Sequence, residues 1–91
     1  MKPAIVLSDR DNVATALEAL EAGRALELGG RSLVVAERIP SGHKIALQPI
    51  GAGEPIVKYG NPIGTATSAI APGQHVHIHN VASTRGRGDL A

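Results

Sequence analysis

A short glycine pattern recurs four times along this chain: an apolar residue, two residues, glycine, two residues and a second apolar residue. The copies span residues 20–26, 39–45, 50–56 and 70–76. Glycine at the fourth position permits the positive φ that a tight turn needs, and in three copies the last apolar residue begins an apolar–polar alternation. The pattern therefore predicts tight turns, each followed at once by a strand. Because the copies are unevenly spaced, we expect a reused turn rather than a solenoid.

The amino-terminal quarter predicts a different local structure. Residues 4–7 form a short apolar run that is typical of a buried strand. The next segment predicts one helix of roughly three turns, with Asp11 as its N-cap and Gly23 as its stop. The apolar positions of this helix follow i, i+4 and i+7 spacing at Val13, Leu17 and Leu20. We expect a mostly β fold with one short amino-terminal helix, as a single domain over residues 1–82 followed by a flexible tail over 83–91.

The composition narrows the functional classes. Tyr59 is the only aromatic residue and the formal net charge is +1, so we expect no nucleic-acid partner. There is no cysteine, which excludes disulfides and thiolate metal sites and leaves only nitrogen and oxygen ligands for a metal. No stretch reaches the roughly 20 apolar residues of a membrane span, and the apolar run near the start is too short for a signal peptide. We expect a soluble, cytoplasmic protein.

Three of the four histidines alternate near the carboxyl end, at His75, His77 and His79. If this segment is a strand, its two-residue period puts the imidazoles on one face and turns Val76 and Ile78 to the core. Neighbouring histidines on that face lie about 6.5–7 Å apart, so two of them could share one ion. Two histidines plus a ligand from elsewhere is the better geometry. Fe(II), Mn(II) or Zn(II) is the chemical expectation, and a solvated or interface face is the alternative.

His43 and Lys44 form the second candidate, directly after the Gly42 turn. A histidine beside a lysine could bind or protonate a carboxylate substrate, and an exposed polar turn is the alternative. Alignment of the turn copies matches His43 to Gln74 and Lys44 to His75. We therefore expect both pairs to leave equivalent turns towards the same side of the domain.

Several segments in combination resemble the SAF-type domain of the altronate/galactarate dehydratase family. They are Gly-His-Lys-Ile-Ala-Leu at 42–47, Gly-Glu-Pro-Ile-Val-Lys-Tyr-Gly at 53–60, Ile-Gly at 63–64 and Gly-Gln-His-Val-His-Ile-His-Asn at 73–80, with 11–14 and 85–90 also fitting. The resemblance covers nearly the whole chain. It implies a β-clip, a small folded-over β structure that occurs fused to a large catalytic region or as a separate small subunit.

The resemblance also implies an activity. This chain stops where fused members would continue, so it resembles the small subunit of a two-component, Fe(II)-associated dehydratase that needs a large catalytic subunit. Such a hydro-lyase removes water from a 2,3-dihydroxy sugar acid to give a 2-keto-3-deoxy acid; a related two-subunit lyase removes sulfite from sulfolactate. His43 and Lys44 are then the catalytic candidates, and Asn80 joins them in binding substrate. The metal candidates are His75, His77 and His79.

Two other functions stay open at this point. SAF-type domains also occur as non-catalytic modules, so the polar face could bind a carbohydrate or dock to a partner. The chain could also be a structural subunit that stabilises the large chain and touches no substrate. A small domain with a polar functional face is expected to self-associate or to sit at an interface, which makes a homo-oligomer an option. The specificity pocket for the substrate is expected on the partner.

Overall fold

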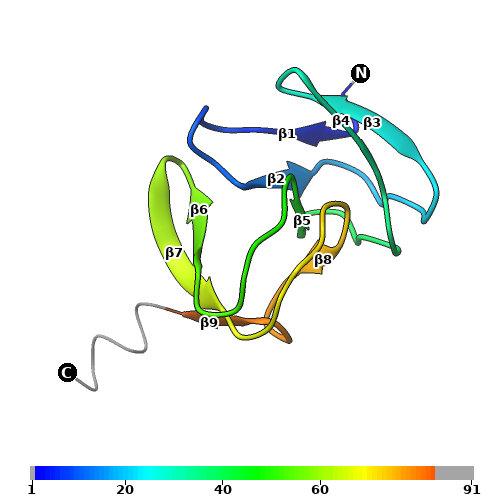
Figure 1. The fold of residues 1–91 in the computed structure, drawn as a ribbon. Helices are drawn as coiled ribbons and strands as arrows, with labels where there is room; N and C mark the ends of the chain where they lie inside the picture. The colour runs from blue at the N-terminus through cyan, green and yellow to red at the C-terminus, as the bar shows by residue number, and fades with distance from the viewer. Residues whose placement is uncertain (1, 84–91) are drawn as a thin grey trace.

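The computed structural model describes residues 2–83, which form nine antiparallel strands and no helix (Figure 1). The strands are β1 (Ala4–Ile5), β2 (Val13–Ala16), β3 (Ala25–Leu28), β4 (Arg31–Val34), β5 (Lys44–Ala46), β6 (Pro55–Lys58), β7 (Asn61–Ala66), β8 (His75–Val76) and β9 (Val81–Ser83). They build a four-stranded sheet in the order β1-β2-β5-β8, a β3–β4 hairpin and a three-stranded sheet in the order β6-β7-β9. The mostly β prediction is confirmed.

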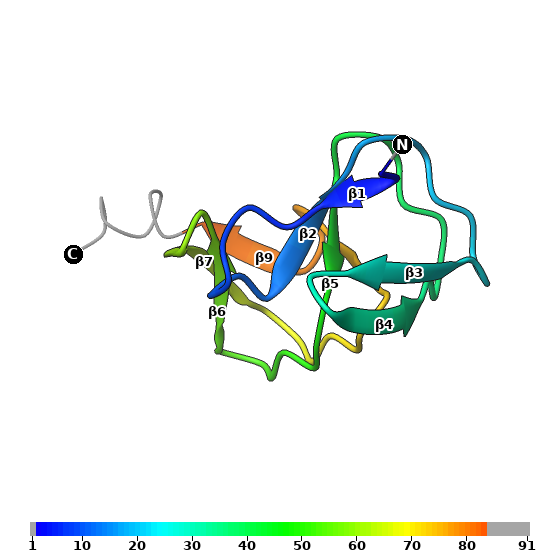
Figure 2. The same ribbon diagram turned by 90° about the horizontal axis from the view of Figure 1, so that it is seen from above.

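The four-stranded sheet buries both of its faces. Residues directly opposite one another in an antiparallel pair lie on the same face, and Ala14 pairs with Ile45 while Val13 pairs with Ala46. Ala14 and Ile45 pack with the leucines of the β3–β4 hairpin, whereas Val13 and Ala46 pack with residues of β6 and β7. The sheet therefore lies between the hairpin on one side and the β6-β7-β9 sheet on the other, as Figure 2 shows from above.

All four glycine turns form as predicted. Gly23, Gly42, Gly53 and Gly73 have φ between 85° and 91°. In each turn the residue after glycine donates its backbone N–H to the carbonyl three positions earlier, over 3.0 to 3.3 Å. Positive φ at the third position of such a turn defines type II geometry, which glycine adopts without steric cost.

The turns come in two pairs that bracket two hairpins. The apolar residues that open the turns form isolated bridges, Leu20 with Ile39 and Ile50 with Ile70. The first bridge closes the β3–β4 hairpin and the second closes the β6–β7 hairpin. Because Leu20 and Ile50 stand 30 positions apart and Ile39 and Ile70 stand 31 apart, the chain uses one arrangement twice.

The predicted helix after Asp11 is wrong. Val13–Ala16 instead form β2, which lies between β1 and β5 and gains hydrogen bonds on both edges. Leu17, a predicted apolar position of the helix, is 52% exposed. Asp11 caps no helix: its buried carboxylate accepts the backbone N–H groups of Tyr59 at 3.2 Å and Gly60 at 2.8 Å in the β6–β7 turn. Pairing with distant strands thus outweighs the local helical spacing.

The two ends of the chain differ from the expectations in smaller ways. The strand predicted over residues 4–7 covers only Ala4–Ile5. Ser83, expected to begin the tail, is the last residue of β9, and the rest of the predicted tail lies outside the described residues, as does the 85–90 segment. Residues 2–83 contain no helix with the length and apolar character needed for a membrane span.

Candidate metal centre

Two of the glycine turns bring three histidines together. His43 follows the Gly42 turn, and His75 opens β8 directly opposite Ile45 of β5. Because His43 and Ile45 are two residues apart, the His43 side chain lies on the same side of β5 as His75. The Nδ1 atom of His43 lies 2.8 Å from Nε2 of His75, and the His77 ring stacks on His43 with 3.9 Å between ring centres. We call these three residues the histidine cluster.

The geometry of the histidine cluster suits a single metal ion. One ring nitrogen from each histidine lies within 4.8 Å of the other two, and all three side chains are half-buried. Three nitrogens bound to one ion at about 2.1 Å can be at most about 4.2 Å apart. The three rings stack nearly parallel, so they would have to rotate to point all three nitrogens at one ion. Three imidazoles without a thiolate are a donor set for Fe(II), Mn(II) or Zn(II), and these residues therefore fit the predicted metal.

His75, His77 and His79 do not lie on the face of one strand. β8 ends at Val76, and residues 77–80 form a turn in which the Asn80 N–H donates to the His77 carbonyl at 3.1 Å. Ile78, which was expected in the core, is 84% exposed, so that part of the prediction is wrong. His79 lies beside His75 with a tilt of 36° and outside the cluster. The structure thus brings together two histidines of the row and a third from elsewhere, His43.

Asn80 explains why the strand stops. Its buried side chain accepts the His77 backbone N–H at 2.9 Å through Oδ1 and donates to the His75 carbonyl at 2.8 Å through Nδ2. These bonds replace the strand pairing that the two backbone groups would otherwise need. Asn80 therefore positions His75 and His77, and its predicted contact with substrate stays a prediction.

The environment favours the neutral form of two of the imidazoles. Burial lowers the pKa of His75, and the neighbouring His79, His43 and His77 lower it further, against an opposing effect of Glu37. The pKa of His77 is lowered by desolvation and then by His43, Lys44 and His79. Neutral imidazole is the form that coordinates a metal, so the cluster is biased towards the ligating state.

Glu37 is a neighbour of the cluster that the sequence analysis missed. Its Oε2 atom accepts the backbone N–H of His75 at 3.2 Å, and its charge acts on the His75 ring. The segment that carries Glu37 is held beside His75 by a hydrogen bond of 2.8 Å from the Ala36 N–H to the Gly73 carbonyl. No local motif marks Glu37, because the contact joins segments 38 residues apart.

Lys44 lies on the opposite face of β5 from His43 but remains close to the cluster. Its pKa is lowered by burial and then by the charge of Lys58. Lys44 and His77 line a hollow of about 220 Å³ together with apolar side chains; the full lining is Lys44, Ile63, His77, Ile78, Val81 and Ser83. His77 therefore borders both the histidine cluster and this hollow, which we call the Lys44 hollow.

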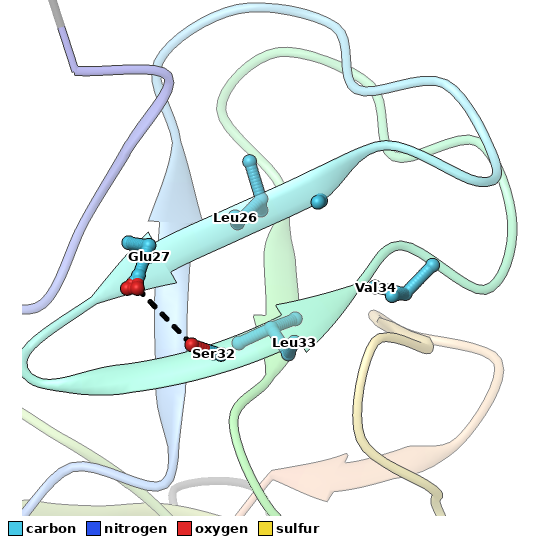
Figure 3. Close-up of a pocket in the computed structure, with 6 residues that line it drawn as sticks. Leu26, Glu27, Ser32, Leu33 and Val34 are labelled. Carbon is cyan, nitrogen blue, oxygen red and sulfur yellow. Dashed lines mark hydrogen bonds between the residues drawn. The ribbon is translucent and has the colours of Figure 1, made fainter.

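A second hollow, of about 370 Å³, lies on the β3–β4 hairpin (Figure 3). Leu26, Leu33 and Val34 supply most of its apolar wall, and its polar groups include Glu27 and Ser32, which share a hydrogen bond of 3.1 Å. None of the predicted site residues lines it. The residues predicted to bind metal or substrate therefore lie at or next to the histidine cluster and the Lys44 hollow.

Comparison with known proteins identifies the family. Residues 2–84 match the altronate/galactarate dehydratase SAF domain. The chain belongs to this family. The resemblance that residues 42–47 and 73–80 suggested is confirmed, and the histidine cluster is assembled from those two segments of the SAF domain.

Curated relatives of this SAF domain are lyases. Altronate dehydratase of Bacillus subtilis is 46% identical over 80 residues, which cover 88% of this chain and 16% of the relative. Galactarate dehydratase (L-threo-forming) of Escherichia coli is 40% identical over 79% of this chain and 14% of its own length. The (2R)-sulfolactate sulfo-lyase subunit alpha of Chromohalobacter salexigens is 41% identical over 56% of this chain and 54% of its own length. The chain thus spans a small part of the dehydratases and about half of the sulfo-lyase subunit.

Proposed function

We propose that this chain is the small SAF component of a metal-dependent hydro-lyase that acts on sugar acids with a large catalytic subunit. The reaction removes water from a 2,3-dihydroxy acid of the altronate or galactarate type and gives a 2-keto-3-deoxy acid. The observation that carries the proposal is the histidine cluster, three imidazoles with nitrogens within 4.8 Å, in a chain of a dehydratase SAF family. Dehydratase and sulfo-lyase relatives support the reaction class.

The residues of this chain divide into two tasks. His43, His75 and His77 hold a divalent ion, with Fe(II) first and Mn(II) or Zn(II) as alternatives. When bound, such an ion supplies Lewis-acid stabilisation of the charge that develops when the proton next to a carboxylate is removed. His43 was expected to bind or protonate substrate; as a ligand it loses that freedom, and the proposal leaves substrate contact to Lys44.

The large subunit supplies the remaining acid and base groups in this proposal. The dehydratase relatives are about six to seven times longer than the matched segment, since it covers 14–16% of them. The name of the sulfo-lyase relative, subunit alpha, supports an arrangement with separate chains. The half-buried histidine cluster then forms one side of a composite site, and the partner forms the other.

Reconstitution tests the proposal. The chain is co-purified with a candidate large dehydratase subunit, the metal content is measured, and altronate, galactarate and sulfolactate are screened for turnover. We expect activity that needs both chains and a loss of metal and turnover in His77→Ala, with His79→Ala as the matched control outside the cluster. A His77→Ala protein with full metal content and turnover would overturn the metal assignment. Full activity of the large subunit alone would favour a structural role.

A further inference from the structure

The sheet face that carries Lys44 also holds one buried polar atom without a partner among residues 2–83. Lys44 pairs with Thr15 of β2, so the two side chains lie on the same face of the sheet. The Thr15 hydroxyl oxygen is buried and has no hydrogen-bond partner among residues 2–83. Buried polar atoms are rarely left unpaired in native proteins, so the Thr15 hydroxyl marks a polar spot beside Lys44, although Thr15 does not line the Lys44 hollow.

Lys58 is a second positive charge that acts on Lys44, although it does not line the hollow. Lys44 and Lys58 are both half-buried, and the charge of Lys58 acts on Lys44. Neither lysine forms an ion pair within the described part of the chain, where Arg24 pairs with Glu18 and Arg38 with Glu21. The ammonium of Lys58 lies 5.1 Å from the centre of the Tyr59 ring, a neutral group that leaves its charge uncompensated. An anion bound at Lys44 would offset the repulsion between the two positive charges.

The Lys44 hollow gives such an anion a suitable place. Its walls include the apolar side chains of Ile63 and Val81, both half-buried, and of Ile78, which is 84% exposed. A charge-assisted hydrogen bond from an ammonium to an oxyanion is stronger in such surroundings than in bulk water. His77 lines the same hollow, so a bound molecule would reach from Lys44 to the histidine cluster.

We propose that the Lys44 hollow binds the carboxylate or sulfonate group of a small organic acid, with Lys44 as the direct contact and Lys58 as the supporting charge. The role of this anion site in the reaction rests on the proposed function. The oxyanion anchors the acid at Lys44, and the hydroxyl-bearing atoms of the acid lie towards the histidine cluster. The anion site itself needs no metal.

NMR titration of the metal-free full chain, held in chelator, tests the site. Sodium acetate and sodium methanesulfonate are added separately, and sodium chloride is matched to them in ionic strength. We expect saturable amide shifts at Lys44, His77 and Val81 with at least one of the two organic anions, and the stronger of the two identifies the oxyanion class. Shifts that merely reproduce those of chloride would overturn the proposal.

Lysine variants test whether the anion binds at Lys44 with support from Lys58. Lys44→Met should weaken binding by about tenfold, the effect of losing one charge-assisted hydrogen bond, and Lys58→Met should weaken it by a smaller factor. Lys2→Met, which changes an exposed lysine elsewhere, should bind as the wild type does. If Lys44→Met fails to fold, Lys58→Met and Lys2→Met still decide, because equal affinity in these two variants contradicts the site. Anion binding without metal binding would contradict only the proposed metal site. Metal binding without anion binding would contradict only the proposed anion site.

Discussion

Gly73 shows at the scale of one residue how closely two distant segments meet beside the cluster. Its φ is 87°, and a Cβ atom there would overlap the carbonyl oxygen of Val34 and approach the Ala36 nitrogen to 3.2 Å. The Gly73 carbonyl also accepts the N–H of Ala36. Gly73 therefore allows the segment that carries Glu37 to reach His75, two residues after Gly73.

We predict that Gly73→Ala costs about 3 kcal/mol or more of unfolding free energy. About 1–2 kcal/mol comes from the left-handed backbone conformation, and backbone overlap adds to this. Gly42→Ala is the matched control, because Gly42 has φ of 85° but open space around its Cβ position, and it should cost only about 1–2 kcal/mol. Urea unfolding measures both variants. Equal losses would contradict the close approach at Gly73.

At the scale of elements, the glycine turns and the β class follow from the sequence, but strand β2, where a helix was predicted, and the end of β8 do not. A turn is encoded locally, by one glycine three residues after an apolar residue. Val13–Ala16 form a strand only because β1 and β5 pair with both of its edges, which local spacing does not reveal. The alternation at His75–His79 predicts a longer strand, and the Asn80 side chain ends it after Val76.

We predict that the Asn80 side chain stabilises the 77–80 turn and supports metal binding. Asn80→Ala removes two side-chain hydrogen bonds and should lower the free energy of unfolding by about 1–2 kcal/mol. It should also weaken metal binding by about tenfold or more, because the backbone of His75 and His77 loses its support. Urea unfolding and metal titration measure the two effects. Asn61→Ala, at an exposed residue with one side-chain hydrogen bond, is the control and should change neither strongly. Unchanged metal affinity in Asn80→Ala would argue against a positioning role.

At the scale of the whole molecule, the cluster forms where two equivalent turns meet. The Gly42 and Gly73 turns close the two repeated halves, and β5 pairs with β8 so that Ile45 lies opposite His75. Matching the turn copies predicts that both histidine-bearing turns face one side, and the contact between His43 and His75 agrees. The contact itself depends on strand register across the fold, so the sequence alone favours the row of His75, His77 and His79 as metal ligands.

The cluster should make the stability of the metal-free protein depend on pH. The pKa values of His75 and His77 are lowered in the folded state, so below the unfolded value of about 6.5 the unfolded chain binds more protons. Their contribution to the free energy of unfolding is therefore intact above pH 6.5 and falls as the pH drops through this value. Urea unfolding in chelator at pH 7 and pH 5 should show a larger loss for the wild type than for a His75→Gln/His77→Gln double variant. The same pH dependence in both proteins would refute the argument.

Co(II) titration followed by visible absorption shows which histidines of the cluster bind a metal ion. Co(II) reports nitrogen coordination in sites that bind Fe(II) or Zn(II). We predict one Co(II) per wild-type chain, binding at least about tenfold weaker in His43→Ala and His77→Ala, and wild-type binding in His79→Ala. Loss of binding in His79→Ala with wild-type binding in His43→Ala, or no specific Co(II) binding by the wild type, would contradict this prediction.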